Sequence, residues 1–217
     1  MRTKISVQTK KLLADMQTPV SLYLKMRDEY AESALLESSD YHSSDNSYSF
    51  IGVDPIAHIK VEKGIVSKKY PSGDIIEDKL TEHNKLTDVF QSFINDFVVL
   101  GNNQTNFNGF LGYTSFDSIY HFEDINPDQT KQSKKAVPEF YYILYRFTIV
   151  INHMTNELTI VENIPEDESS KMHELENTLS NNNIAMYHFE SLGEEQSNIT
   201  DDEHIQMIHK GISHCKR

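Results

Sequence analysis

The sequence predicts an α+β fold in which an antiparallel β-sheet dominates and helices pack on its faces. Three observations support this prediction. Residues 34 to 70 hold strand-like runs separated by turn signals. Residues 138 to 153 form a long β-branched and aromatic run, and residues 158 to 161 follow as its hairpin partner. Between these regions, residues 79 to 100 show the apolar spacing of a helix.

Length and composition indicate a globular protein. The 217 residues are enough for one substantial core in one or two domains, and 38% of them are apolar. No run of about 18 apolar residues is present, so the sequence excludes a membrane-spanning helix. The basic N-terminus lacks the apolar region of a secretory signal, and Cys215 is the single cysteine. A reducing compartment, the cytoplasm, is therefore expected.

The net charge argues against nucleic acid as a partner. The formal charge is −13 at pH 7, and the basic residues are dispersed rather than clustered. A polyanion is bound by a clustered basic patch, which this chain does not have in its sequence. We therefore expect neither a nucleic acid nor a membrane as the binding partner.

The N-terminal elements are expected to be short. Val7 to Asp15 predict a helical or mixed segment rich in lysine. Thr18 can cap a short helix whose first turn holds Pro19. Three strands should follow, at residues 49–53, 57–61 and 65–70, with turn signals at residues 54–55 and 63–64 between them.

The central helix is predicted over Lys79 to Leu100. Its apolar residues recur three and four positions apart, which favours burial against a core rather than a ligand-binding stripe. Gly101 tolerates the left-handed conformation that ends such an element. The apolar face consists of Leu86, Val89, Phe90, Phe93, Ile94 and Phe97.

The next informative stretch is Phe107 to Asp117. Gly109 and Gly112 lie three apart within an apolar strand, which predicts a close backbone approach or a bulge. The glycine pattern of a phosphate-binding loop is absent, so nucleotide binding is not indicated. The long strand at residues 138–153 and a turn at residues 154–157 then lead into the hairpin partner.

The last third of the chain predicts two helices and a linker. Residues 165 to 183 are acidic, and their apolar stripe of Met172, Leu175 and Leu179 predicts a surface helix. Thr200 and Glu203 form a capping box that opens an amphipathic helix. We expect one domain over residues 1–190, followed by a linker and an amphipathic helix over residues 191–217. The residue pattern by itself favours a terminal helix.

A candidate binding site lies where two strand-like runs end in small polar groups. Ala34 to Ser38 ends with Glu37 and Ser38, and Ser49 begins the next strand. This layout can hold a carboxylate and hydroxyls at the rim of a sheet, facing a small zwitterion. An ordinary hairpin with a serine-rich loop would show the same pattern.

Other chemistries lack their sequence signatures. The ten histidines form no metal-binding pattern, and one cysteine cannot supply a thiolate cluster. The Gly-x-Ser-x-Gly motif of a serine nucleophile is also absent. The residue patterns therefore indicate neither a metal site nor a serine nucleophile.

Four segments, in order, resemble the N-terminal part of anthranilate synthase component I: residues 34–38, 48–55, 107–117 and 138–153. The helix after Thr200 is similar to the one that introduces the family's chorismate-binding domain. One departure is Asn152, which stands where the family usually has Asp. The resemblance implies that Leu36, Glu37, Ser38 and Ser49 contribute to an allosteric L-tryptophan site.

The resemblance also implies an activity for the parent enzyme. Component I converts chorismate and ammonia to anthranilate and pyruvate, and a glutamine amidotransferase subunit, component II, supplies the ammonia. A Mg²⁺ ion acts as a Lewis acid in that reaction. The catalytic residues and the Mg²⁺ site belong to the C-terminal domain, so these residues alone are expected to be an inactive, truncated part.

Two alternatives remain at the level of sequence. Aminodeoxychorismate synthase component I shares much of this N-terminal part. A free-standing amino-acid-binding regulatory module would also explain a ligand site without catalytic residues.

Overall fold

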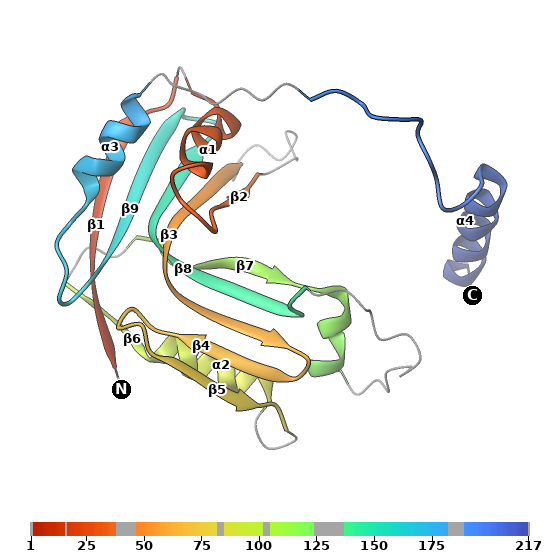
Figure 1. The fold of residues 1–217 in the computed structure, drawn as a ribbon, viewed down its shortest axis with the longest axis horizontal. Coiled ribbons are helices and arrows are strands. Elements are labelled where there is room, and N and C mark those ends of the chain that lie inside the picture. The colour runs from red at the N-terminus through yellow and green to blue at the C-terminus, as the bar shows by residue number, and fades with distance from the viewer. Residues whose placement is uncertain are drawn as a thin grey trace. The chain divides into compact units, whose positions relative to one another are not determined.

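The chain folds into two compact units, residues 1–185 and 186–217, which are described separately. The structure is a computed structural model, and it describes residues 2–15, 17–37, 47–81, 85–101, 105–123, 137–181 and 189–216. The first unit confirms the predicted α+β fold. Nine strands of its described residues form one sheet, which is antiparallel except for one parallel pair (Figure 1).

The elements follow one another along the chain with short connections. The strands are β1 (Thr3–Leu13), β2 (Ala34–Leu36), β3 (Tyr48–Glu62), β4 (Ile65–Lys69), β5 (Ile75–Lys79), β6 (Phe97–Leu100), β7 (Phe110–Thr114), β8 (Phe140–Asn152) and β9 (Glu157–Pro165). The helices are α1 (Pro19–Arg27), α2 (Leu86–Asn95), the 3₁₀ helix η1 (Phe116–His121), α3 (Met172–Ser180) and, in the second unit, α4 (Asp201–Cys215).

The sheet has the order β5-β4-β3-β8-β9-β1-β6, with β2 paired to β3 and β7 paired to β8. Strand β8 lies at its centre. It pairs with β3 along most of its length, whereas on its other side it pairs first with β7 and then with β9. The change of partner falls at Tyr145 and Arg146, which belong to neither of those two ladders.

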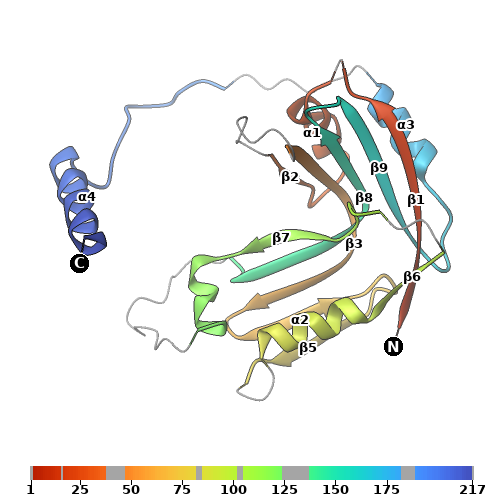
Figure 2. The same cartoon turned by 180° about the vertical axis from the view of Figure 1, so that it is seen from behind.

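Two of the apolar clusters on the sheet are covered by helices, and these two are called the first and second cores. Helices α1 and α3 lie on the part of the sheet that contains β9 (Figure 1). Helix α2 packs on the part that contains β4 and β7 (Figure 2). The first core includes Leu22, Met26, Ile51, Val53, Ile149, Ile160, Leu175 and Leu179, and the second includes Ala57, Ile59, Val61, Leu86, Val89, Phe93, Phe140 and Leu144.

Strand β3 is bent between these two cores. It was expected as two strands separated by Asp54-Pro55, but it is one strand from Tyr48 to Glu62 with an irregularity between Pro55 and Ala57. Asp54 has φ +60°, a left-handed conformation that is uncommon outside glycine. The turn signal therefore marks a bulge, because pairing with β8 continues on both sides of it.

A buried guanidinium group stands opposite this bulge. Arg146 is 2% exposed, and its Nε lies 3.0 Å from Asp54 Oδ2. Its Nη1 lies 3.7 Å from an oxygen of Glu162, which is fully buried, and its Nη2 contacts Glu168. Ser170 Oγ and the Lys171 main-chain N–H also donate to Glu162. These contacts connect the bulge in β3 to β8, β9 and the start of α3.

Of the two glycines expected to mark a close backbone approach, Gly109 and Gly112, only Gly112 does so. A Cβ on Gly112 would stand 2.0 Å from the main-chain oxygen of Tyr141, so a side chain cannot be accommodated in β7 there. Gly109 has open space around it. Close approach of β7 to β8 therefore depends on Gly112.

Two sequence predictions were wrong about the elements nearest the sheet edge. The segment at Val7–Asp15, expected to be helical or mixed, mostly belongs to strand β1, where Ile5 and Val7 are buried and pairing with β9 extends to Leu13. The helix expected over Lys79–Leu100 is confined to α2, and Phe97–Leu100 form β6 in parallel with β1. In both cases pairing with a distant strand outweighed local preference.

Several local predictions are confirmed. Thr18 and Ser21 form a capping box at α1, with Pro19 in its first turn. Three residues of the stripe expected for α2 are buried in that helix, Leu86, Val89 and Phe93, and the whole α3 stripe of Met172, Leu175 and Leu179 is buried. In the second unit, the Thr200–Glu203 capping box opens α4, and none of the described residues of that helix is buried. No helix in the described parts of the chain is long and apolar enough to cross a membrane.

The Arg146 contacts yield a stability prediction. Arg146→Met should lower the free energy of unfolding by about 3–5 kcal/mol, because it leaves the buried Glu162 without its cation. The double variant Arg146→Met/Glu162→Gln should recover part of this loss. Urea denaturation measures both changes.

An exposed ion pair provides the matched control. Lys4 and Glu166 lie 2.7 Å apart, with side chains 49% and 52% exposed. Lys4→Met should change stability little, since exposed pairs contribute little. Equal losses in Lys4→Met and Arg146→Met would contradict the structural role given to Arg146.

Candidate functional site

The predicted binding residues lie around the short ladder between β2 and β3. Its three pairs are Ala34 with Gly52, Leu35 with Ile51, and Leu36 with Phe50. Glu37 is the next residue after the ladder and is exposed. Ser38, also predicted for this site, lies outside the described residues.

Successive residues of β2 face opposite sides of the sheet. Leu35 packs against the core under α1 and α3. Leu36 pairs with Phe50 and is 40% exposed, which is high for a leucine within a strand. The end of β2 therefore has an accessible apolar side chain at Leu36, and the exposed residue Glu37 follows it in the chain.

Ser49 occupies a different environment. It is fully buried, and its Oγ lies 2.8 Å from Nε2 of His153, the first residue after β8. In β3 it alternates with Phe50, the partner of Leu36, so Ser49 and Leu36 point to opposite faces. Leu36 and Glu37 are thus both exposed at the end of β2, whereas Ser49 is enclosed on the opposite face of the sheet from Leu36.

His153 is the residue that sequence reasoning missed. A serine at an inward-facing position of an apolar strand is a signal that a polar partner is needed, because buried hydroxyls are hydrogen-bonded. The identity of that partner depends on the β3–β8 register, which places the end of β8 beside the start of β3.

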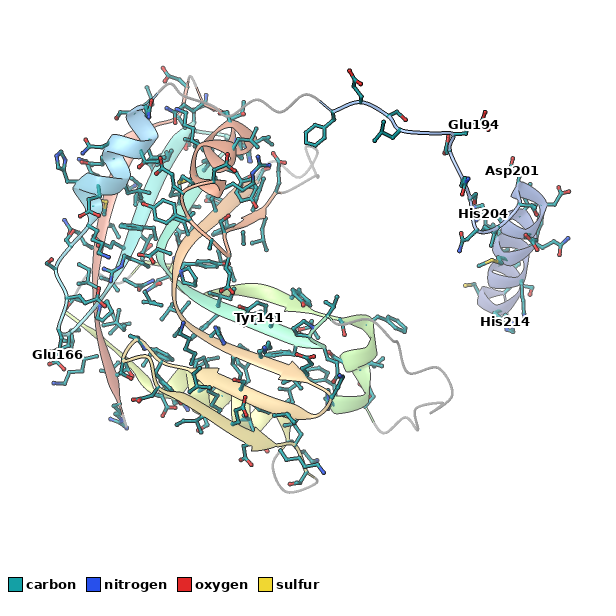
Figure 3. The ribbon with its side chains drawn as sticks, in the orientation of Figure 1. Tyr141, Glu166, Glu194, Asp201, His204 and His214 are labelled. Carbon is teal, nitrogen blue, oxygen red and sulfur yellow. The ribbon has the colours of Figure 1, made fainter. Side chains whose placement is uncertain are left out.

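An aromatic group lies on β8 close to the turn before β2. Tyr141, labelled in Figure 3, donates a long hydrogen bond of 3.4 Å to Glu32, which has φ +56°. The rings of His58 and Tyr113 both contact the Tyr141 ring edge-on. Burial, followed by the negative charge and the hydrogen bond of Glu32, raises the pKa of Tyr141 to about 12. Burial also lowers the pKa of His58.

A separate open cavity of about 380 Å³ lies between β1 and α3. Leu158 and Leu179 contribute apolar lining, and Lys10 and Glu176 pair at its polar side. None of the predicted binding residues lines this cavity. It is therefore distinct from the edge formed by β2 and β3.

Metal binding finds no support among the described residues. No group of three or more His, Cys, Asp or Glu side chains in those ranges is placed to hold an ion. Asp54, Glu162 and Glu168 do converge, but they surround the guanidinium of Arg146. The described residues therefore do not fit the Mg²⁺ site that the resemblance implies for the parent enzyme.

Comparison with known protein families shows to which family this chain belongs. The sequence pattern of the family described as chorismate binding enzyme matches residues 32–217, most of the chain. The chain belongs to the chorismate binding enzyme family. The match begins just before β2, so the β2–β3 edge lies inside the family region.

Curated members of the family resemble the chain at low identity. Anthranilate synthase component 1 of Lactococcus lactis is 26% identical over 174 residues, which are 80% of this chain and 36% of that protein. The Neisseria meningitidis serogroup B protein of the same name is 30% identical over 155 residues, 69% of this chain and 30% of that protein. The chain thus spans about a third of the length of these relatives.

A solved structure also matches. Anthranilate synthase component I from Streptococcus pneumoniae TIGR4 aligns with 78% of this chain and 35% of that chain, at 20% identity and a TM-score of 0.43.

The aromatic group yields a pH prediction. The pKa of Tyr141 is raised from 10.0 to about 12, so the unfolded chain loses this proton first. Because the folded state holds this proton more tightly, Tyr141 contributes its full stabilisation of the folded state below about pH 10. This contribution is lost as the pH rises towards 12. Tyr141→Phe should remove one absorbance transition near pH 12 and make stability less dependent on pH in that range. A missing transition centred near pH 10 would contradict this assignment.

Proposed function

We propose that residues 1–217 are the N-terminal part of an anthranilate synthase component I. The whole enzyme would aminate chorismate with ammonia from a glutamine amidotransferase subunit and release anthranilate and pyruvate. Family membership and the shared name of the similar proteins support this proposal. The relatives are about three times longer than the matched region, which leaves room for a catalytic part outside these residues.

The described residues contribute regulation in this proposal. The observation that carries it is the exposed Leu36-Glu37 pair at the end of β2. Glu37 would accept hydrogen bonds from the ammonium group of L-tryptophan, a charge-assisted contact. Leu36 would contact the indole ring, and Ser38 would bond a polar group of the ligand. The two exposed residues match an amphipathic zwitterion better than a fully charged ligand.

The site would be completed from outside this chain. An edge that offers one carboxylate and one apolar side chain leaves most of an indole uncovered, whereas binding sites enclose most of a small ligand. The second wall, the catalytic residues and the Mg²⁺ would belong to a part of the enzyme outside these residues. Tryptophan would inhibit only by binding two states of the enzyme with different affinity.

This proposal predicts the effect of Glu37→Gln on tryptophan binding. The test protein, called the joined protein, is residues 1–217 followed by the remaining two-thirds of the Lactococcus lactis relative. Calorimetry should detect binding by the joined protein and little or none by residues 1–217 alone. Glu37→Gln should weaken binding about tenfold or more, because hydrogen bonds to charged groups contribute about 1.5–3 kcal/mol.

Glu77→Gln serves as the matched control, because Glu77 is an exposed carboxylate on β5, away from the β2–β3 ladder. It should leave tryptophan affinity unchanged. Equal affinity in Glu37→Gln and the unaltered joined protein would refute the assignment of Glu37. Tight binding by residues 1–217 alone would instead indicate a complete regulatory site within this chain.

A further inference from the structure

The hydrogen bond between Ser49 and His153 joins the turn after β8 to the start of β3. The Ser49 Oγ and His153 Nε2 atoms are 2.8 Å apart. The main-chain N–H of His153 also donates to the carbonyl oxygen of Ser47, at 3.0 Å. His153 therefore contacts the beginning of β3 through both its ring and its backbone.

The turn that carries His153 is itself held in place. The Asn152 side-chain oxygen accepts from the main-chain N–H groups of Met154 and Thr155, at 2.9 and 3.2 Å. Its amide nitrogen donates to the hydroxyl of Tyr48 at 3.4 Å. A side chain on an ordered turn can fix the position of its partner, because little of its own freedom remains to be lost.

Glu37 and Ser49 both flank the last pair of the β2–β3 ladder. This pair is Leu36 with Phe50, so Glu37 directly follows the paired residue of β2 and Ser49 directly precedes the paired residue of β3. The β2–β3 ladder has only three pairs. Any shift of Ser49 would therefore act on β3 one residue from the pair that precedes Glu37 in β2.

A second buried hydroxyl, Ser47, lies just before β3. Ser47 is also buried, yet its Oγ has no hydrogen-bond partner among the described residues. Of the two serines at the start of β3, Ser49 is the one whose side chain is tied to another element. This tie is made from a residue 104 positions away in the chain.

We propose that His153, acting through Ser49, is a positioning residue for Glu37 and so sets the affinity of the effector edge without touching the effector. The inference rests on the proposed function, since the effector edge is the Leu36-Glu37 end of β2. Ser49 then belongs to the regulatory site as a support for its carboxylate rather than as a ligand contact.

The first variants remove and restore the hydrogen bond. In the joined protein, Ser49→Ala and His153→Ala should each weaken L-tryptophan binding about fivefold, the effect of losing one buried hydrogen bond. His153→Gln should recover most of the affinity, because its carboxamide can reach the serine hydroxyl. Ser49→Thr keeps the hydroxyl and should also retain binding. These two variants keep the test valid if an alanine variant does not fold.

Thr148→Val is the matched control. Thr148 is 1% exposed on β8, and its hydroxyl has no partner among the described residues. This variant removes a buried hydroxyl from the same sheet and should leave affinity within about twofold of the original. In residues 1–217 without ligand, amide hydrogen exchange at positions 35–37 and 49–50 should accelerate in Ser49→Ala but not in Thr148→Val.

The outcomes separate this inference from the proposed function. Tryptophan binding that is lost in Glu37→Gln but unchanged in Ser49→Ala and His153→Ala overturns the positioning role and leaves the function standing. A similar loss of affinity in Thr148→Val and Ser49→Ala also overturns it, because any change in the core would then have the same effect. Absence of binding by the unaltered joined protein overturns both proposals.

Discussion

The buried guanidinium of Arg146 is the contact on which the arrangement of the sheet depends. It lies where β8 exchanges β7 for β9 as its neighbour, and opposite the bulge at Asp54 in β3. A buried charge must be compensated, and Glu162 beneath α3 supplies the opposite charge from β9. One side chain therefore links the bend, both halves of the sheet and the segment that leads into α3. The two apolar cores form on either side of this point.

The candidate site lies on the part of β3 that precedes the bend. The part of β3 before the bulge, beginning at Tyr48, carries the β2 ladder on one edge and pairs with the end of β8 on the other. Ser49 and His153 meet there, and Leu36 and Glu37 lie at the free end of β2. Burial and hydrogen bonding thus fix the inner face of this edge, while its outer residues stay accessible. Such a division between a rigid support and an exposed contact is typical of binding edges.

Local sequence patterns predicted those elements whose signals are local. The Thr18 capping box, the stripe of α2 and the long strand β8 required only neighbouring residues. Strands β1 and β6 could not be predicted in this way, because their conformation depends on each other and on β9. The same limit applies to the site. The exposure of Glu37 agrees with its place after an apolar run, whereas the Ser49–His153 contact joins residues 104 positions apart.

The proposed function is tested by measuring the release of anthranilate. We predict that the joined protein, given chorismate and ammonium with Mg²⁺, releases anthranilate and pyruvate, and that L-tryptophan inhibits this reaction. Circular dichroism should first establish that the protein is folded. A folded joined protein that releases no anthranilate, or one whose rate is unaffected by tryptophan, would contradict the account.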